Sequence, residues 1–297
     1  MKARPWLRRL LRLGTLAVVL WLGASSFIAY KLTHRHRARY EEPTPAVSWG
    51  TLAPLRLVAT DGAECGAWFL DGQVEKPPVV LLHGNGADRS QCLPQAAIAA
   101  RRGHPVLLLT VRAHGDSTGE VNDIGYSARQ DLIAAVNWLH HRKPNRRVVL
   151  WGQSLGSAVA AFAAADLGDR AGGYILESPY RDLRTAVRNR TEMALPAVLN
   201  EVAYYGLATV APLFVGDVDR IAPVDAVAAI PSAVPVLIVA GSADQHARPF
   251  EARAIHERLG PRSRLVMIDG APHGGLTQAD PAGYEAAVTE LLGRALP

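Results

Sequence analysis

Cysteine is scarce in this sequence, because only Cys65 and Cys92 occur among its 297 residues. Their separation of 27 residues matches neither a zinc-ligand pair nor a redox Cys-x-x-Cys motif. The sequence therefore predicts no metal site. It leaves open whether the two cysteines form one disulfide or remain as free thiols.

Acidic residues are absent from the first 40 positions, which hold nine Lys and Arg residues. The rest of the chain therefore has 23 of the 32 basic residues against all 27 Asp and Glu residues. The formal net charge of +5 thus belongs to the N-terminus and not to the body of the chain. A nucleic-acid surface needs its basic residues on the folded domain, so we expect no nucleic-acid partner.

Charge of either sign is missing from Leu13–Tyr30, an apolar run of 18 residues between cationic flanks. This length is at the lower limit for a helix that crosses the hydrocarbon core of a bilayer. The favoured interpretation is a single membrane-spanning signal anchor. The alternatives are a signal peptide cleaved near the small residues Ala24 and Ser26, and a buried core helix.

The flanks of this run divide the N-terminus into a basic segment, residues 1–12, the spanning segment 13–30, and a polar linker, residues 31–50. Five Lys and Arg residues precede the span and four follow it within ten residues. This balance gives only a weak positive-inside bias. Default insertion would place the N-terminus in the cytoplasm and the body of the chain outside it; cleavage would release the body as a secreted protein.

Short runs of Val, Leu and Ile recur along residues 51–297 and alternate with segments of helical period. Continuous apolar runs are typical of strands buried on both faces of a parallel sheet. Strands that alternate with helices indicate an α/β fold with helices on both faces of the sheet. We expect antiparallel edge strands over 52–70. The predicted strands are 78–84, 105–111, 147–154, 173–178, 235–244 and 264–270, and the predicted helices are 95–102, 123–142, 155–167, 249–259 and 281–292.

Residues 179–232 interrupt this alternation, since they hold no strong strand, several prolines and a long apolar helical run. In an open α/β sheet, an insertion at this place lies near the carboxyl ends of the strands, where ligands bind. The segment is therefore predicted to be a helical cap over a site. Its apolar residues are equally consistent with ordinary packing helices.

Ser154 stands between Gly152 and Gly156, directly after the apolar run VVLW and before a small-residue helix. A serine on such a sharp strand-to-helix turn projects its hydroxyl above the sheet, and the tight turn requires small neighbours. The local context thus predicts a nucleophile elbow, with Ser154 as the nucleophile.

A serine hydroxyl needs a general base, and the base needs an acid that orients it. His273 follows the last predicted strand in a Gly/Pro loop and is the favoured base; His114 and His246 are the rivals. Asp244 ends the preceding strand and is the favoured acid. The rival acids, Asp217 and Asp219, are at the end of the predicted cap.

The oxyanion that forms when the serine attacks needs preorganised hydrogen-bond donors. The backbone N–H of Leu155, at a helix N-terminus, is one candidate. The second is the N–H of Asn85, in the glycine-rich loop after the first buried strand. His83, in the same loop, is predicted to brace that loop by hydrogen bonds.

These motifs together resemble the α/β-hydrolase superfamily, and within it the membrane-anchored branch with an HGNG oxyanion loop and a GQSLG elbow. The resemblance implies an α/β-hydrolase fold and a cofactor-free serine esterase, lipase or thioesterase acting on acyl or lipid-like substrates. It implies the catalytic residues Ser154, Asp244 and His273. The motifs that carry it are VVLLHGNGAD, RAHGDSTGE, VVLWGQSLGSAVA, LESPYRDL, VLIVAGSADQHARP and APHGG.

Two other functions remain alternatives at this point. One is a serine peptidase of the same fold. The other is a non-catalytic binding protein on a hydrolase scaffold, because a fold does not fix a function.

Overall fold

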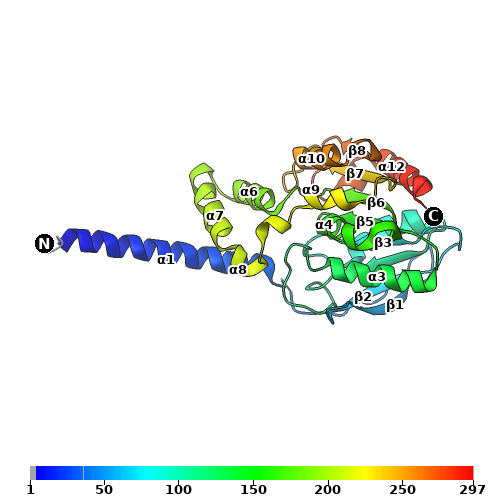
Figure 1. Ribbon diagram of the computed structural model, residues 1–297, viewed down its shortest axis with the longest axis horizontal. Coiled ribbons are helices and arrows are strands. Elements are labelled where there is room, and N and C mark those ends of the chain that lie inside the picture. Colours follow the sequence, from blue (N-terminus) through cyan, green and yellow to red (C-terminus); the bar gives the residue numbers. More distant parts are fainter. Residues whose placement is uncertain (1–4, 36, 297) are drawn as a thin grey trace.

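A computed structural model describes residues 5–35 and 37–296. Residues 1–4 of the predicted basic flank, His36 of the predicted linker, and Pro297 lie outside the described residues. A long N-terminal helix extends from an α/β body that carries the C-terminus on its far side (Figure 1). A group of helices lies between the two, beside the end of the long helix.

The body is built on one sheet of eight strands in the order β1-β2-β4-β3-β5-β6-β7-β8. Strands β1, β2 and β4 pair antiparallel, and all other neighbours pair parallel. This confirms the predicted parallel sheet with an antiparallel edge. The strands are β1 (Ala53–Val58), β2 (Glu64–Leu70), β3 (Val79–Leu82), β4 (Val106–Leu109), β5 (Val148–Gln153), β6 (Ala171–Glu177), β7 (Val236–Gly241) and β8 (Ser263–Ile268).

Helices cover both faces of the sheet, which explains why its strands are apolar without alternation. On one face pack α3 (Arg129–Arg142), α4 (Leu155–Phe162) and α10 (Pro249–Leu259). On the other pack α2 (Leu93–Arg101) and α12 (Pro281–Arg294). The shorter helical elements of the body are η1 (Arg89–Cys92), α5 (Ala164–Leu167), η2 (Gly168–Arg170), η5 (Gly260–Arg262) and α11 (Leu276–Ala279).

The strand order reverses at β3, because the chain passes from β3 to β4 on one side and returns to β5 on the other. The loops that follow β3 and β5 therefore diverge at the carboxyl ends of these two strands and leave a crevice between them. In open α/β sheets this switch point is where ligands bind. Asn85 follows β3 and Ser154 follows β5, so the fold places both at this crevice.

The helix predicted for 123–142 begins only at Arg129, and that part of the prediction is wrong. The Asp123 carboxylate accepts the backbone N–H of Ser127 at 2.9 Å, which fixes a turn. Ile124 and Gly125 have φ angles of +55° and +97° within this turn. A right-handed helix cannot continue through such residues, so the helix starts after them.

Residues 179–232, the predicted cap, contain only helices and turns. Helices α6, α7 and α8 project from the body, and α7 and α8 lie against α1 (Figure 1). Their bounds are α6 (Leu183–Ala194), α7 (Ala197–Val210) and α8 (Pro212–Val215), followed by η3 (Val218–Arg220), α9 (Pro223–Ala226) and η4 (Val227–Ala229).

Helix α1 runs from Pro5 to Thr33 and includes the predicted span. Within the described residues, two helical stretches are long and apolar enough to cross a membrane, namely Arg8–Thr33 and Ala197–Val215. Only 11% of the most apolar window of the first stretch is buried. A core helix would be mostly buried, so this exposure contradicts the core-helix alternative for α1.

The predicted linker, residues 31–50, begins as the last turn of α1 and then follows the surface of the body. Arg35 donates hydrogen bonds to the carbonyls of Gly115 and Gly119. Further along, Arg89 makes two hydrogen bonds to Asp116, at 2.8 and 2.9 Å, and its Nη1 lies 3.2 Å from Glu42 Oε1. The segment is thus held on the body near the loop that contains Asn85.

Burial raises the pKa of Glu42 to about 7. Between the ordinary carboxyl pKa and this value, the folded state keeps a proton that the unfolded state has released. The stabilisation from Glu42 is therefore full at low pH and is lost as the pH rises through about 7. Glutamine at position 42 stays neutral at every pH. We therefore expect the melting temperature of Glu42→Gln, measured relative to the native protein, to be higher at about pH 8 than at about pH 5.5.

Thermal melting of both proteins at the two pH values measures this gain. The control is Glu41→Gln at the exposed neighbouring position. A difference for Glu42→Gln that stays constant with pH would contradict the assignment of a buried proton to this carboxyl.

Candidate active site

Ser154 occupies the turn between β5 and α4 with φ +51° and ψ −108°, a backbone conformation that residues other than glycine rarely adopt. Its N–H donates to the carbonyl of Glu177 at 2.8 Å, which ties the turn to the end of β6. A Cβ at Gly152 would lie 2.2 Å from the Gly156 backbone, and one at Gly156 would lie 2.3 Å from Leu82 O. Neither position can hold a side chain, so the glycines permit the strained turn.

The hydroxyl of Ser154 lies in a row with an imidazole and a carboxylate from two other strand ends. Ser154 Oγ is 2.8 Å from His273 Nε2, and His273 Nδ1 is 2.7 Å from Asp244 Oδ2. An ionised carboxylate only accepts hydrogen bonds, so Nδ1 carries the proton. Nε2 is then left as the acceptor of the serine O–H.

Asp244 is fixed before any substrate arrives. Its side chain has no exposed area, and its Oδ1 accepts the backbone N–H groups of His246 and Ala247 at 2.8 and 2.9 Å. Its second oxygen is thereby directed at His273. On the other side, Ser178 Oγ donates to the carbonyl of His273 at 3.1 Å, a support that sequence patterns do not indicate.

The rival acids lie elsewhere. Asp217 accepts the N–H of Asp219 and pairs with Arg220 at 3.1 Å. Asp219 pairs with Arg184 at 3.0 Å, and both aspartates are exposed. They serve as turn and surface carboxylates, with their hydrogen bonds made inside or beside the cap.

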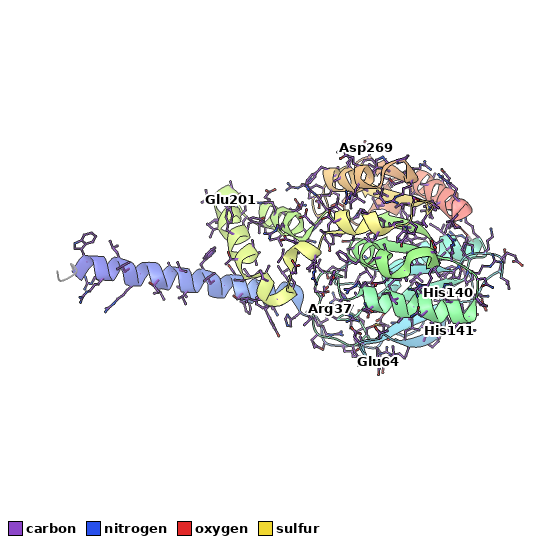
Figure 2. All side chains as sticks on the ribbon, in the orientation of Figure 1. Arg37, Glu64, His140, His141, Glu201 and Asp269 are labelled. Atoms are coloured by element: carbon purple, nitrogen blue, oxygen red, sulfur yellow. The ribbon has the colours of Figure 1, made fainter. Side chains whose placement is uncertain are left out.

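The rival histidines also have other partners. The nitrogens of His114 lie 2.8 Å from the carbonyl of Arg112 and 3.3 Å from Asn85 Oδ1. His246 stacks at a tilt beside His273, with 5.1 Å between the ring centroids. His140 and His141, on α3, lie at the far side of the body from α1 (Figure 2).

The loop after β3 is braced by hydrogen bonds. Fully buried His83 accepts the N–H of Val111 at 3.1 Å and lies 2.7 Å from the Gly84 carbonyl. Burial lowers the pKa of His83 to about 3, so the ring is neutral. This confirms its predicted bracing role. The Gly84 N–H in turn donates to Gln91 Oε1 at 2.7 Å.

Asn85 is held by its side chain, whose Oδ1 accepts from Asn122 Nδ2 at 2.7 Å. In residues 5–35 and 37–296, no protein group accepts a hydrogen bond from the backbone N–H of Asn85 or of Leu155. Both residues line the same cavity as Ser154. The two predicted oxyanion donors therefore remain free to bind an oxygen at this site.

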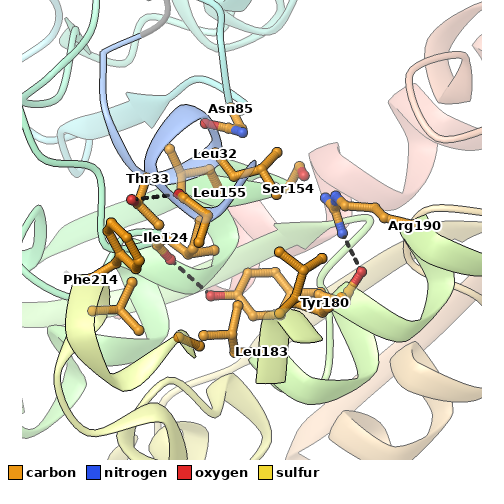
Figure 3. A pocket seen from close by; sticks show the side chains of 16 residues that line it. Leu32, Thr33, Asn85, Ile124, Ser154, Leu155, Tyr180, Leu183, Arg190 and Phe214 are labelled. Atoms are coloured by element: carbon orange, nitrogen blue, oxygen red, sulfur yellow. Dashed lines mark hydrogen bonds between the residues drawn. The ribbon is translucent and has the colours of Figure 1, made fainter. Parts of the chain in front are cut away.

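The cavity at Ser154 has a volume of about 790 Å³, part of it open to the surroundings. Its walls are mostly apolar, and they come from the body, from the cap and from the end of α1 (Figure 3). The lining residues outside the body are Ala29, Leu32 and Thr33 of α1, and Tyr180, Leu183, Ala186, Val187, Arg190, Leu207, Ala211, Phe214 and Val215 of the cap.

Two polar residues of this cavity, Tyr180 and Arg190, could not be recognised as site residues from the sequence. The hydroxyl of Tyr180 donates to the carbonyl of Ile124 at 2.8 Å, so it is occupied. Arg190 directs its guanidinium toward Ser154 (Figure 3), and its Nη1 donates to the Ala186 carbonyl at 2.9 Å.

The cysteines stand apart from this site. Cys65 and Cys92 are free, buried and in hydrophobic clusters on opposite faces of the sheet. Burial raises the pKa of both thiols, so neither is a reactive thiolate. Among the described residues, no group of three or more His, Cys, Asp or Glu side chains has the arrangement of a metal site.

This chain is similar to known proteins in both sequence and fold. The family described as "alpha/beta hydrolase fold" matches residues 77–220. The solved structure of the Pyrococcus furiosus esterase Pf2001 superimposes with a TM-score of 0.69 at 23% identity. The superposition covers 88% of this chain and 99% of the esterase.

Curated relatives match at the sequence level. The lysophosphatidylserine lipase ABHD12 of Gallus gallus is 29% identical over 155 residues, which cover 50% of this chain and 40% of that protein. The chain thus spans well under half the length of the relatives it matches first. An uncharacterized Mycobacterium tuberculosis protein, Rv2307c, is 27% identical over 276 residues, or 90% of each chain.

Proposed function

We propose that this chain, which has the α/β-hydrolase fold, is a serine hydrolase that cleaves carboxylic ester or thioester bonds. The observation that carries the proposal is the row from Ser154 Oγ through His273 to Asp244, with spacings of 2.8 and 2.7 Å. It supplies a nucleophile, a base and an orienting acid in the arrangement that acyl transfer needs.

In the proposed mechanism, Ser154 Oγ attacks the substrate carbonyl carbon while His273 Nε2 takes the hydroxyl proton. The N–H groups of Leu155 and Asn85 stabilise the oxyanion. His273 then donates its proton to the departing alcohol or thiol, leaving an acyl-enzyme. Water, deprotonated by His273, attacks the acyl-enzyme, and His273 returns the proton to Ser154 Oγ as the acid leaves. Asp244 keeps the imidazole oriented and stabilises its charged form throughout.

The walls of the cavity support an acyl or lipid-like substrate. Leu155, Ile124 and Leu183 line the cavity together with Ser154, and apolar residues of α1, α7 and α8 complete its walls. A relative with half of this chain aligned carries the name lysophosphatidylserine lipase, which agrees with that substrate class.

The same proposal assigns α1 as a membrane anchor that leaves the catalytic body outside the cytoplasm. The support is the length of the apolar stretch Arg8–Thr33 and the exposure of its side chains. Among them, Leu13, Leu20 and Phe27 are each about 64% exposed. In a bilayer, lipid acyl chains would cover these side chains.

Parallel assays on acyl esters, acyl thioesters and short peptides test the proposed activity, each with several acyl lengths. We expect turnover of esters or thioesters, with medium and long acyl chains preferred over acetyl. Turnover of peptides alone would assign a peptidase. Absence of any turnover in folded protein would favour a binding protein on this scaffold.

A further inference from the structure

Helix α7 packs against the second half of α1 over three successive turns. Trp21 Nε1 donates to the Val202 carbonyl at 3.0 Å. A Cβ at Gly206 would lie 2.2 Å from Ser25 Oγ, so the two helices are in close backbone contact there. One turn further, Ala29 is buried against Leu207 and Val210.

These contacts fix the depth of α7 relative to the apolar stretch of α1. Residues 21–29 of α1 cover about 12 Å of helix and lie in the half of the span nearer the body. If α1 crosses a bilayer, a helix that packs on this half lies at the depth of the hydrocarbon. Helix α7 is therefore beside the lipid and not in the surrounding water.

The outward side chains of α7 and α8 suit that position. Val198 and Leu213 are 76% and 79% exposed, and Leu199, Val202 and Tyr205 are also exposed. From residue 195 to residue 215, the only charged side chain is that of Glu201. Glu201 forms an ion pair with Arg188, whose guanidinium lies 3.7 Å from the ring centroid of Tyr204.

The substrate cavity lies between the same helices. Its walls include Leu32 of α1, Leu207 of α7 and Phe214 of α8, and Ser154 lines the same cavity. Helix α1 is thus a wall of the site as well as a candidate anchor.

We infer that α7 and α8 insert with α1 into the bilayer leaflet nearer the catalytic body, and that the cavity receives a lipid ester directly from that leaflet. The inference rests on the proposed hydrolase function and on the proposed anchor. The partner of the exposed face of α7 and α8 is therefore the bilayer. A second protein on this face is the competing outcome.

Depth-dependent quenching tests the insertion without any need for catalysis. The full chain is reconstituted in nanodiscs, and an environment-sensitive fluorophore is attached to a single introduced cysteine in Leu213→Cys, Val18→Cys or Val74→Cys. Cys65 and Cys92 are buried and serve as the unlabelled background. Val74 is 64% exposed and lies in the loop between β2 and β3 of the body, so it is the matched aqueous control.

Lipids with spin-labelled acyl chains should quench the fluorophore at positions 18 and 213 and leave position 74 bright. Quenching at 18 but not at 213 would overturn the insertion of the cap, and would favour a protein partner for this face. Quenching at neither position would overturn the anchor as well.

Entry from the leaflet is tested by Leu213→Asp, with Val74→Asp as the control. A charge at hydrocarbon depth opposes insertion, so we expect hydrolysis of a long-chain lipid ester in nanodiscs to fall about tenfold or more. Hydrolysis of a short soluble ester should be unchanged in both variants. An equal fall for both substrates, or none, would overturn leaflet entry. If the native protein cleaves neither ester, the proposed hydrolase function itself fails, whatever the quenching shows.

Arg190 is a half-buried cation in this mostly apolar cavity. Among the described residues, no carboxylate lies within ion-pair distance of its guanidinium, and its one protein acceptor is the Ala186 carbonyl. Buried charges are normally paired. From this we propose, again on the basis of the hydrolase function, that Arg190 binds an anionic group of the ester substrate, either phosphate or carboxylate.

The test compares lysophosphatidate, an anionic ester, with a neutral monoacylglycerol of the same acyl chain. In Arg190→Gln we expect kcat/KM for the anionic ester to fall about 10- to 100-fold, with the neutral ester changed less than about threefold. Arg190→Lys should restore part of the loss, because it keeps the charge but not the planar fork. Equal losses on both esters, or a native preference for the neutral ester, would overturn this role. Cleavage of neither ester would instead count against the hydrolase function.

Discussion

Ser154→Ala is expected to lower kcat for p-nitrophenyl acyl esters on the order of 10⁶-fold, to the assay background. The change removes the only protein atom that forms a bond to the acyl group in the proposed mechanism. The loss of one hydroxyl should leave folding intact, because the strained backbone of the turn depends on Gly152 and Gly156 and not on the serine side chain. Initial-rate assays and circular dichroism on the same preparation measure both effects.

The matched control is Ser232→Ala, the same deletion at an exposed loop position before β7. It should retain native activity. If Ser154→Ala also retained native turnover while folded, another nucleophile would have to be sought, and the assignment of the elbow would be wrong.

Asp244→Asn should lower kcat on the order of 10⁴-fold, by analogy with the effect of the same change in other serine triads. The amide can still accept the N–H groups of His246 and Ala247 through its oxygen. Its Nδ2 would then face His273 Nδ1 and donate to it. The imidazole would be forced into the tautomer with its proton on Nε2, which cannot accept the proton of Ser154.

The matched control for this change is Asp217→Asn, because an asparagine can also accept the Asp219 N–H that Asp217 now accepts. Its kcat should remain within about twofold of the native value. The reverse pattern, with Asp217→Asn inactive and Asp244→Asn active, would move the orienting acid to the cap.

Both predictions concern residues whose position follows from the sequence by simple geometry. Ser154, Asp244 and His273 each come just after an apolar run, and parallel strands end at a common edge. The strands were thus enough to predict that the three side chains lie near one another. The glycines beside Ser154 added the turn, and the structure shows that neither has space for a Cβ.

The cavity walls could not be predicted in this way. Arg190 is one of several arginines on α6, and nothing in the local pattern tells which one faces Ser154. Leu32 lies more than a hundred positions from Ser154 and reaches the cavity only because α1 packs on α7. Such contacts depend on how the cap sits on the body, which is decided by tertiary packing and not by periodicity.

The start of α3 shows a further limit. Residues 123–128 carry a helical period, yet the carboxylate of Asp123 and the positive φ angle of Ile124 end that pattern before it forms a helix. A side chain that competes for the local backbone N–H groups overrides periodicity. Its effect is visible only once the turn is known.

The central claim is that Ser154 is the activated nucleophile, and covalent labelling tests it most directly. The folded full-length protein is treated with a fluorophosphonate probe, digested and examined by mass spectrometry. We expect one adduct, on the peptide that contains Ser154, and its absence in His273→Ala. An adduct on a different serine, or none in the native folded protein, would contradict it.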